Sequence, residues 1–225
     1  MQTGEDRPES QPVLVWDAPT RLFHWLIVVL VAAAYVTWQW DWMVWHVWLG
    51  ETLLALLLFR LLWGVFGSDT ARLARLLGSP GAAFTHLAHI VRREPDRQIG
   101  HNPAGGFMVL LMLALLLGET LSGLYLNNDV ADEGPLTELV PAPVANAITA
   151  LHSILWDVLL AAVALHILAI VLYAAVKRQN LLRPMITGRK LLPKGTAPPR
   201  RASLLLALLL LGVSAAAAAL LATFL

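Results

Sequence analysis

Five long apolar segments, separated by shorter polar stretches, dominate the sequence. They cover approximately residues 21–40, 46–66, 104–126, 150–176 and 203–225. Each is close to the ~20 apolar residues that cross a bilayer, and a span exposed to lipid must satisfy its own backbone hydrogen bonds as a helix. The pattern therefore predicts an all-α integral membrane protein. Residues 1–20 form an N-terminal segment, and residues 191–202 form a linker to the fifth span.

Composition supports this class of protein and narrows its chemistry. Of the 225 residues, 58% are hydrophobic and 14% are charged, and the mean hydropathy is +0.66. Such values are typical of a helical membrane protein. The net charge of +1 gives no general case for binding nucleic acid. Cysteine is absent, which excludes disulfides, cysteine-ligated iron–sulfur clusters and thioether-linked haem.

The basic residues are distributed unevenly between the loops. All sixteen lysines and arginines lie outside the loops between spans one and two and between spans three and four. The second of these loops instead carries the acidic residues Asp129, Asp132, Glu133 and Glu138. By the positive-inside rule, the N-terminus is expected in the cytoplasm and the C-terminus at the outer face.

Four histidines fall within the spans. His152 and His166 are fourteen residues apart on the fourth span, and spans one and two carry His24 and His46. Fourteen residues of helix rise ~21 Å and return to within about 40° of the same face. By depth, His46 pairs with His152 near the outer side, and His24 pairs with His166 near the inner side. Two bis-imidazole pairs suit two six-coordinate haems used for electron transfer.

The same four histidines are also compatible with packing or with zinc. A histidine inside a membrane can be a hydrogen-bonded packing residue, although ionisable residues in spans are usually functional. Zinc is the main alternative metal, but it usually requires a compact cluster of three or four ligands. The four histidines instead separate into two layers. A haem-free packing or transport subunit is the corresponding alternative for the whole protein.

Further polar residues in or near the spans have two or more interpretations each. Glu51, Glu119 and Asp157 are candidates for proton transfer, for orienting a histidine or for hydrogen bonds between helices. Arg21 is a candidate partner for a propionate of the inner haem, or for lipid phosphates. Asn102-Pro103 predicts the start of the third span. The preceding His101 belongs to this helix start or faces a quinone or a propionate.

Two surface features suggest contacts with the membrane or with a partner. Tryptophans crowd the outer ends of spans one and two, at positions Trp38, Trp40, Trp42, Trp45 and Trp48. They form an interfacial aromatic belt, or a docking surface for a periplasmic cytochrome beside the acidic loop. Ser79-Pro80 predicts the start of an interfacial helix. Its His86 and His89 are a solvated polar face or, less simply, a metal pair.

Several stretches resemble one protein family in order, spacing and flanking sequence. They are VWDAPTRLFHWL (15–26), HVWLGETLLALLLFRLLWGVFGS (46–68), GHNPAGG (100–106), LHSILWDVLLAAVALH (151–166) and KRQNLLRPMITGRK (177–190). The sequence thus resembles the bacterial cytochrome b561 family, in the branch that includes the cytochrome b subunits of nickel–iron hydrogenases. The resemblance implies a four-helix transmembrane bundle over residues 21–190 that binds two haems b. It also implies that His24, His46, His152 and His166 are their axial ligands.

The fifth span is an addition to the bundle that the resemblance implies. It carries no ionisable residue, and its alanine run permits close helix packing. It packs on its own bundle as an anchor, or docks a partner or a second copy.

The expected function is electron transfer across the bacterial inner membrane. The resemblance implies transfer between a periplasmic-side redox partner (a c-type cytochrome, a hydrogenase or a dehydrogenase) and the quinone pool. An enzymatic alternative is a superoxide oxidase-like protein that reduces quinone. The absence of lysine and arginine from the outer loops argues against it, because they would be needed to attract an anion.

Overall fold

The computed structural model describes residues 10–88, 98–127 and 134–224. Five of its helices are long and apolar enough to span a membrane, which confirms the prediction of an all-α integral membrane protein. These helices are α1 (Ala18–Gln39), α2 (Met43–Phe66), α4 (Pro103–Gly123), α5 (Ala142–Ala175) and α7 (Leu204–Phe224). The shorter elements are α3 (Pro80–Ala88), α6 (Leu182–Thr187), β1 (Ser10–Leu14) and β2 (Arg189–Pro193).

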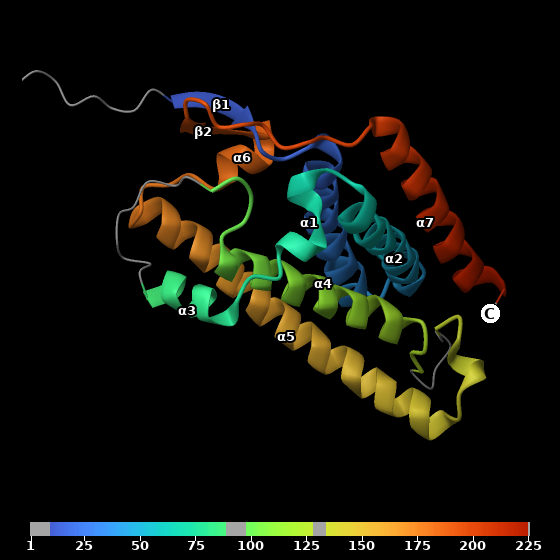
Figure 1. Cartoon of the computed structure of the whole chain (residues 1–225). Coiled ribbons are helices and arrows are strands. Elements are labelled where there is room, and N and C mark those ends of the chain that lie inside the picture. Colours follow the sequence, from blue (N-terminus) through green and yellow to red (C-terminus); the bar gives the residue numbers. More distant parts are fainter. Residues whose placement is uncertain (1–9, 89–97, 128–133, 225) are drawn as a thin grey trace, which may run out of the picture.

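The first four long helices form two antiparallel pairs. α1 packs along α2, α4 packs along α5, and the contact between α2 and α4 joins the pairs (Figure 1). The apolar core lies where they meet, around Leu57, Trp63, Leu116 and Leu159. In the part of the chain that the structure describes, α1 and α5 have few close backbone contacts with each other. Space between these two helices is therefore filled by side chains or by a bound group.

The fifth long helix, α7, packs against α2 on the outside of the bundle (Figure 1). The segment that precedes it is anchored to the loop after α2. The Asp69 backbone N–H donates to the Arg200 carbonyl (3.0 Å), the Arg200 N–H donates to the Asp69 carboxylate (3.2 Å), and the Ala202 N–H donates to Ser68 Oγ (3.0 Å). The helix therefore packs on its own bundle, and docking of a partner or a second copy stays a prediction.

The longest helix extends further than its apolar segment indicates. α5 begins at Ala142, before the apolar segment expected from about residue 150, and has 34 residues. At 1.5 Å per residue it is ~51 Å long, whereas the hydrocarbon core of a bilayer is about 30 Å thick. Its first two turns therefore project beyond that core. Polar residues in these turns, such as Asn146 and Thr149, contact Asn127 after α4.

A two-stranded antiparallel sheet joins the N-terminal segment to the region after α6, and apolar periodicity did not predict it. β1 and β2 pair in register from Ser10–Pro193 to Leu14–Arg189. Strands of five residues are too short to give a clear alternating pattern. Gly188 ends α6 immediately before the second strand with φ +79°, and a Cβ there would lie 2.7 Å from the Trp16 carbonyl oxygen. We call this end of the bundle the sheet end.

Helix starts agree with the sequence where a capping residue is present. Asn102 caps α4 by accepting from the Gly105 N–H (2.7 Å), and Ser79 accepts from the Ala82 N–H at the start of α3 (3.0 Å). Both starts were predicted. The side chains of His86 and His89 lie outside the described residues, as do those of the loop acids Asp129, Asp132 and Glu133. The proposed metal pair and most of the acidic loop are therefore not placed.

Candidate functional site

His24 of α1 and His166 of α5 face each other near the sheet end. Their ring centroids are 6.5 Å apart and the rings are tilted by 54°. His24 Nδ1 is buried without a hydrogen-bond partner among the described residues. A metal–imidazole bond is about 2 Å long, and a ring centre lies about 1 Å behind its nitrogen, so two imidazoles on one metal ion have centres roughly 6 Å apart. The pair therefore fits the axial positions of one haem iron.

His46 of α2 and His152 of α5 form the second pair, toward the opposite end. They are close enough to interact electrostatically, and both also approach Glu119 of α4. His46 Nδ1 lies 2.8 Å from the Ala34 carbonyl oxygen of α1. Because that oxygen only accepts, Nδ1 carries the proton and Nε2 keeps a free lone pair. A histidine that binds a metal is commonly held in this way: the ring nitrogen that does not bind the metal donates its N–H to a carbonyl oxygen.

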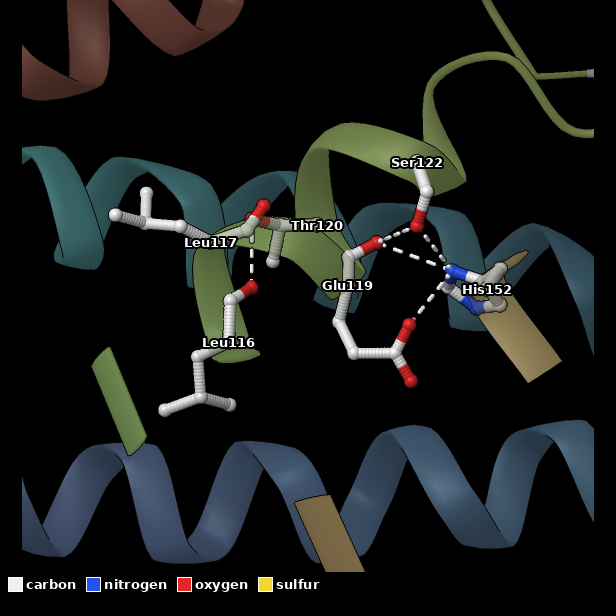
Figure 2. Close-up of polar contacts among 6 residues, drawn as sticks. All are labelled: Leu116, Leu117, Glu119, Thr120, Ser122 and His152. Carbon is white, nitrogen blue, oxygen red and sulfur yellow. Dashed lines mark hydrogen bonds and ion pairs between the residues drawn. The ribbon is translucent and has the colours of Figure 1, made fainter. Parts of the chain in front are cut away.

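His152 is held by three groups near the end of α4. Its Nδ1 lies 2.9 Å from Ser122 Oγ, 3.1 Å from the Glu119 carbonyl oxygen and 2.9 Å from Glu119 Oε2. Figure 2 shows both residues pointing toward the imidazole from one turn of helix. The Glu119 oxygens are acceptors when the carboxyl group is ionised, so Nδ1–H is again the donor and Nε2 is free. α4, which carries no candidate ligand, thus orients a ligand of α5.

Arg21 lies one turn before His24 on α1. Its guanidinium Nη1 donates to the Ile186 carbonyl oxygen of α6 at 2.5 Å, and Trp25 Nε1 donates to the Met185 carbonyl oxygen at 3.2 Å. These bonds attach α6 to the start of α1. Arg21 Nε is buried and has no partner among the described residues. A buried, unpaired guanidinium N–H beside the sheet-end pair matches the requirement for a carboxylate such as a haem propionate.

His101 also lies near the sheet-end pair, although it was expected mainly as part of a helix start. Its ring is 4.6 Å from that of Trp16, and it interacts electrostatically with Arg60, His166 and His24. Part of its side chain is accessible to solvent, but protein atoms surround it on most sides. This burial, together with the neighbouring Arg60 guanidinium, lowers the pKa of His101 to about 4. His101 is therefore neutral at pH 7.

An aromatic pair joins α1 and α5 near the level of His46 and His152. Tyr35 of α1 and Trp156 of α5 stack with centroids 5.4 Å apart and planes inclined by 11°. Trp156 follows His152 by one helical turn, so it lies on the histidine side of α5. This stack is a contact through which the side chains of α1 and α5 meet.

Tryptophans gather around the turn between α1 and α2, and we call this the tryptophan end. All five are at least half exposed, with relative accessibilities from 50% to 60% at positions Trp38, Trp40, Trp42, Trp45 and Trp48. That exposure agrees with a membrane-interface belt and equally with a docking surface.

Two acidic candidates from the sequence lie apart from the histidines. Among the described residues, Glu51 and Asp157 make no polar contact with a candidate ligand histidine.

A multi-ligand metal cluster is not part of the described structure. Within residues 10–88, 98–127 and 134–224, no three histidine, aspartate or glutamate side chains gather as a metal site. Zinc usually takes three or four protein ligands. Axial ligation of a porphyrin iron needs only two ligands from the protein, which is what each histidine pair offers.

Comparison with known proteins gives one family and one relative. The family model described as "Prokaryotic cytochrome b561" matches residues 15–188. A protein of Rhizobium leguminosarum bv. viciae, described as "Probable Ni/Fe-hydrogenase B-type cytochrome subunit", is 27% identical over 223 residues. The match covers 84% of this chain and 92% of that protein. No solved structure matches the chain.

Proposed function

The chain belongs to the prokaryotic cytochrome b561 family, and from this premise we propose that it carries electrons through the membrane by way of two haems b. Family membership and the five apolar helices make it a multi-pass membrane b-type cytochrome of electron transfer. Our proposal concerns the number of haems, their ligands, the orientation of the protein in the membrane and its redox partners.

We assign the haem ligands as two pairs, His24 with His166 and His46 with His152. The observation that carries the assignment is the 6.5 Å separation of the His24 and His166 ring centroids. His46 and His152 support it through their Nδ1 contacts, which leave both Nε2 atoms free. When bound, an iron porphyrin with both axial positions filled takes up and releases one electron without binding substrate. Arg21 would hold a propionate of the sheet-end haem.

We propose that the sheet end faces the cytoplasm and that the tryptophan end faces the periplasm. All lysines and arginines lie in segments that connect to the sheet end, and residues 22–59 and 98–176 contain none. This asymmetry satisfies the positive-inside rule for a protein of the bacterial inner membrane. The N-terminus is then cytoplasmic, and α7 ends at the outer face.

The proposed electron path runs between a periplasmic-side partner, the tryptophan-end haem, the sheet-end haem and the quinone pool. A nickel–iron hydrogenase is the partner that the Rhizobium relative favours, because that protein is described as a hydrogenase subunit. A dehydrogenase or a c-type cytochrome would use the same surface. Superoxide oxidation is not favoured, because the outer loops carry no basic residue to attract the anion.

The experiment that tests the ligand assignment counts haems in single and double histidine variants. The purified wild type is expected to give two haems b per chain in a pyridine haemochrome assay. His24→Ala and His166→Ala should each remove one haem, and the double variant should remove no more than either alone. His46→Ala and His152→Ala should behave in the same way with the other haem.

A control variant separates ligand loss from general damage at the sheet end. His101→Gln changes a histidine near the same pair that we do not assign as a ligand, and it should retain both haems. A wild type that binds no haem contradicts the proposed function. A different pairing of the haem losses, such as His24 and His152 sharing one haem, contradicts the ligand assignment but leaves the proposed function standing.

A further inference from the structure

Glu119 is a buried carboxylate within a membrane-spanning helix. Only 10% of its side chain is accessible, and Oε2 has no aligned hydrogen-bond donor among the described residues. Ionisable groups at such positions are costly and are usually paired or functional. The ring nitrogen His152 Nδ1 lies 2.9 Å from Oε2. The carboxylate is therefore directed at the back of a proposed iron ligand.

The neighbouring hydroxyl groups of α4 donate their hydrogen bonds to backbone carbonyls and not to this carboxylate. Ser122 Oγ donates to the Glu119 backbone carbonyl (3.0 Å), so its proton is not offered to the side chain. Thr120 Oγ1 donates to carbonyls of its own helix, those of Leu116 (3.0 Å) and Leu117 (3.2 Å). Figure 2 shows the Thr120 hydroxyl bonded within α4 and the Ser122 hydroxyl bonded to the Glu119 carbonyl and to His152, while the Glu119 side chain extends toward the His152 ring.

We propose that Glu119 is a positioning residue that holds His152 Nδ1 through its backbone carbonyl, and that its carboxylate charge beside the ring lowers the reduction potential of the tryptophan-end haem. A negative charge beside the ligand stabilises the ferric state, which carries one more positive charge than the ferrous state. The proposal rests on the proposed function, since it requires His152 to bind a haem.

The sheet-end pair offers a natural internal reference. His24 Nδ1 has no hydrogen-bond partner among the described residues, and the electrostatic neighbours of His101 beside that pair are Arg60, His166 and His24, none of them acidic. A change at Glu119 should therefore shift the midpoint potential of one haem and leave that of the other unchanged. A general loss of stability or a change of detergent environment would affect both.

The test is a redox titration of the purified holoprotein at one fixed pH, followed by visible spectroscopy. Glu119→Gln keeps an acceptor and removes the charge. It should retain both haems and raise one midpoint potential, making reduction of that haem at least tenfold more favourable, or about 59 mV for a one-electron couple. Glu119→Asp keeps the charge, and its midpoint potentials should stay closer to those of the wild type. Thr120→Val removes a buried hydroxyl one residue away and should change neither potential.

The outcomes distinguish this inference from the function on which it rests. A colourless wild type contradicts the proposed function. Two haems with unchanged potentials in Glu119→Gln, or equal shifts in Glu119→Gln and Glu119→Asp, overturn the role of the charge. If Glu119→Gln does not fold, Glu119→Leu supplies the second test, because an apolar side chain suits the interior of a membrane and removes the same charge. It should raise the same midpoint potential, and two unchanged potentials overturn the proposal.

Discussion

The contact between Asp17 and Trp63 fixes the start of α1 against α2, and its energy can be predicted from the structure. Asp17 Oδ1 accepts from the Thr20 N–H at 2.8 Å as the helix N-cap, and Oδ2 accepts from Trp63 Nε1 at 3.1 Å. Asp17 is 7% exposed and Trp63 is fully buried. Loss of an N-cap costs about 1 kcal/mol, and an unsatisfied buried donor costs about 1–3 kcal/mol. Asp17→Ala should therefore destabilise the protein by about 2–4 kcal/mol.

A double-mutant cycle isolates the contact with the indole. An amide has one acceptor oxygen where the carboxylate has two, so Asp17→Asn retains only one of the two bonds. Trp63→Phe removes the indole N–H, and in that background Asn can cap α1 without leaving a buried donor unpaired. The coupling energy between the two substitutions should be about 1–3 kcal/mol. The attraction between Asp17 and the buried Arg60 guanidinium is removed in both backgrounds and cancels.

The assay is equilibrium unfolding of the four proteins in mixed detergent micelles, with haem absorbance recorded in parallel. Asp17 precedes His24 by about two helical turns, so Asp17→Ala should also release the sheet-end haem before the other haem. A coupling energy below about 0.5 kcal/mol, the usual scatter for independent sites, would refute the argument that this bond ties the helices together.

Three further predictions concern the sheet end. Arg21→Gln should weaken retention of one haem, measured as the haem-to-protein ratio after gel filtration, whereas Arg183→Gln on the exposed surface should not. Because burial lowers the pKa of His101 from the usual 6.5 to about 4, the unfolded chain binds a proton that the folded chain does not between these values. Stability should fall as the pH drops from 6.5 toward 4, and the melting temperature of His101→Gln should depend less on pH there. Gly188→Ala should lower the melting temperature, because φ is +79° and the new Cβ would lie 2.7 Å from the Trp16 carbonyl oxygen.

The sequence was sufficient for the features that depend on local pattern. Long apolar runs defined the five membrane helices, since each crosses a bilayer of fixed thickness. Helix starts at Ser79 and Asn102 followed from side chains that cap within three residues. The periodicity of α5 also predicted that His152 and His166 share a face, and the structure brings His166 close to His24.

Features that depend on contacts between distant segments could not be predicted in the same way. Glu119 was a candidate for orienting a histidine, but only the packing of α4 on α5 shows that His152 is the histidine it approaches. The contacts of Ser122 with His152 and of the Ala34 carbonyl with His46 were not predicted. The sequence does not distinguish these oxygens from any other hydroxyl or backbone oxygen one helical turn away. The β1–β2 pairing joins segments about 180 residues apart, and no local periodicity records such a partnership.

The charges near the two histidine pairs have opposite signs, and this asymmetry bears on the direction of electron flow. Glu119 lies beside the tryptophan-end pair, whereas the sheet end carries two guanidinium groups, Arg21 and Arg60, of which Asp17 balances only one. A carboxylate favours ferric iron and a guanidinium favours ferrous iron, so both charges make the tryptophan-end haem the one of lower potential. Electrons would then move downhill from the tryptophan end to the sheet end. In the proposed orientation, that direction carries electrons from a periplasmic donor to quinone, as a hydrogenase partner requires. The haem that responds to Glu119→Gln must then be the one of lower potential in the wild type.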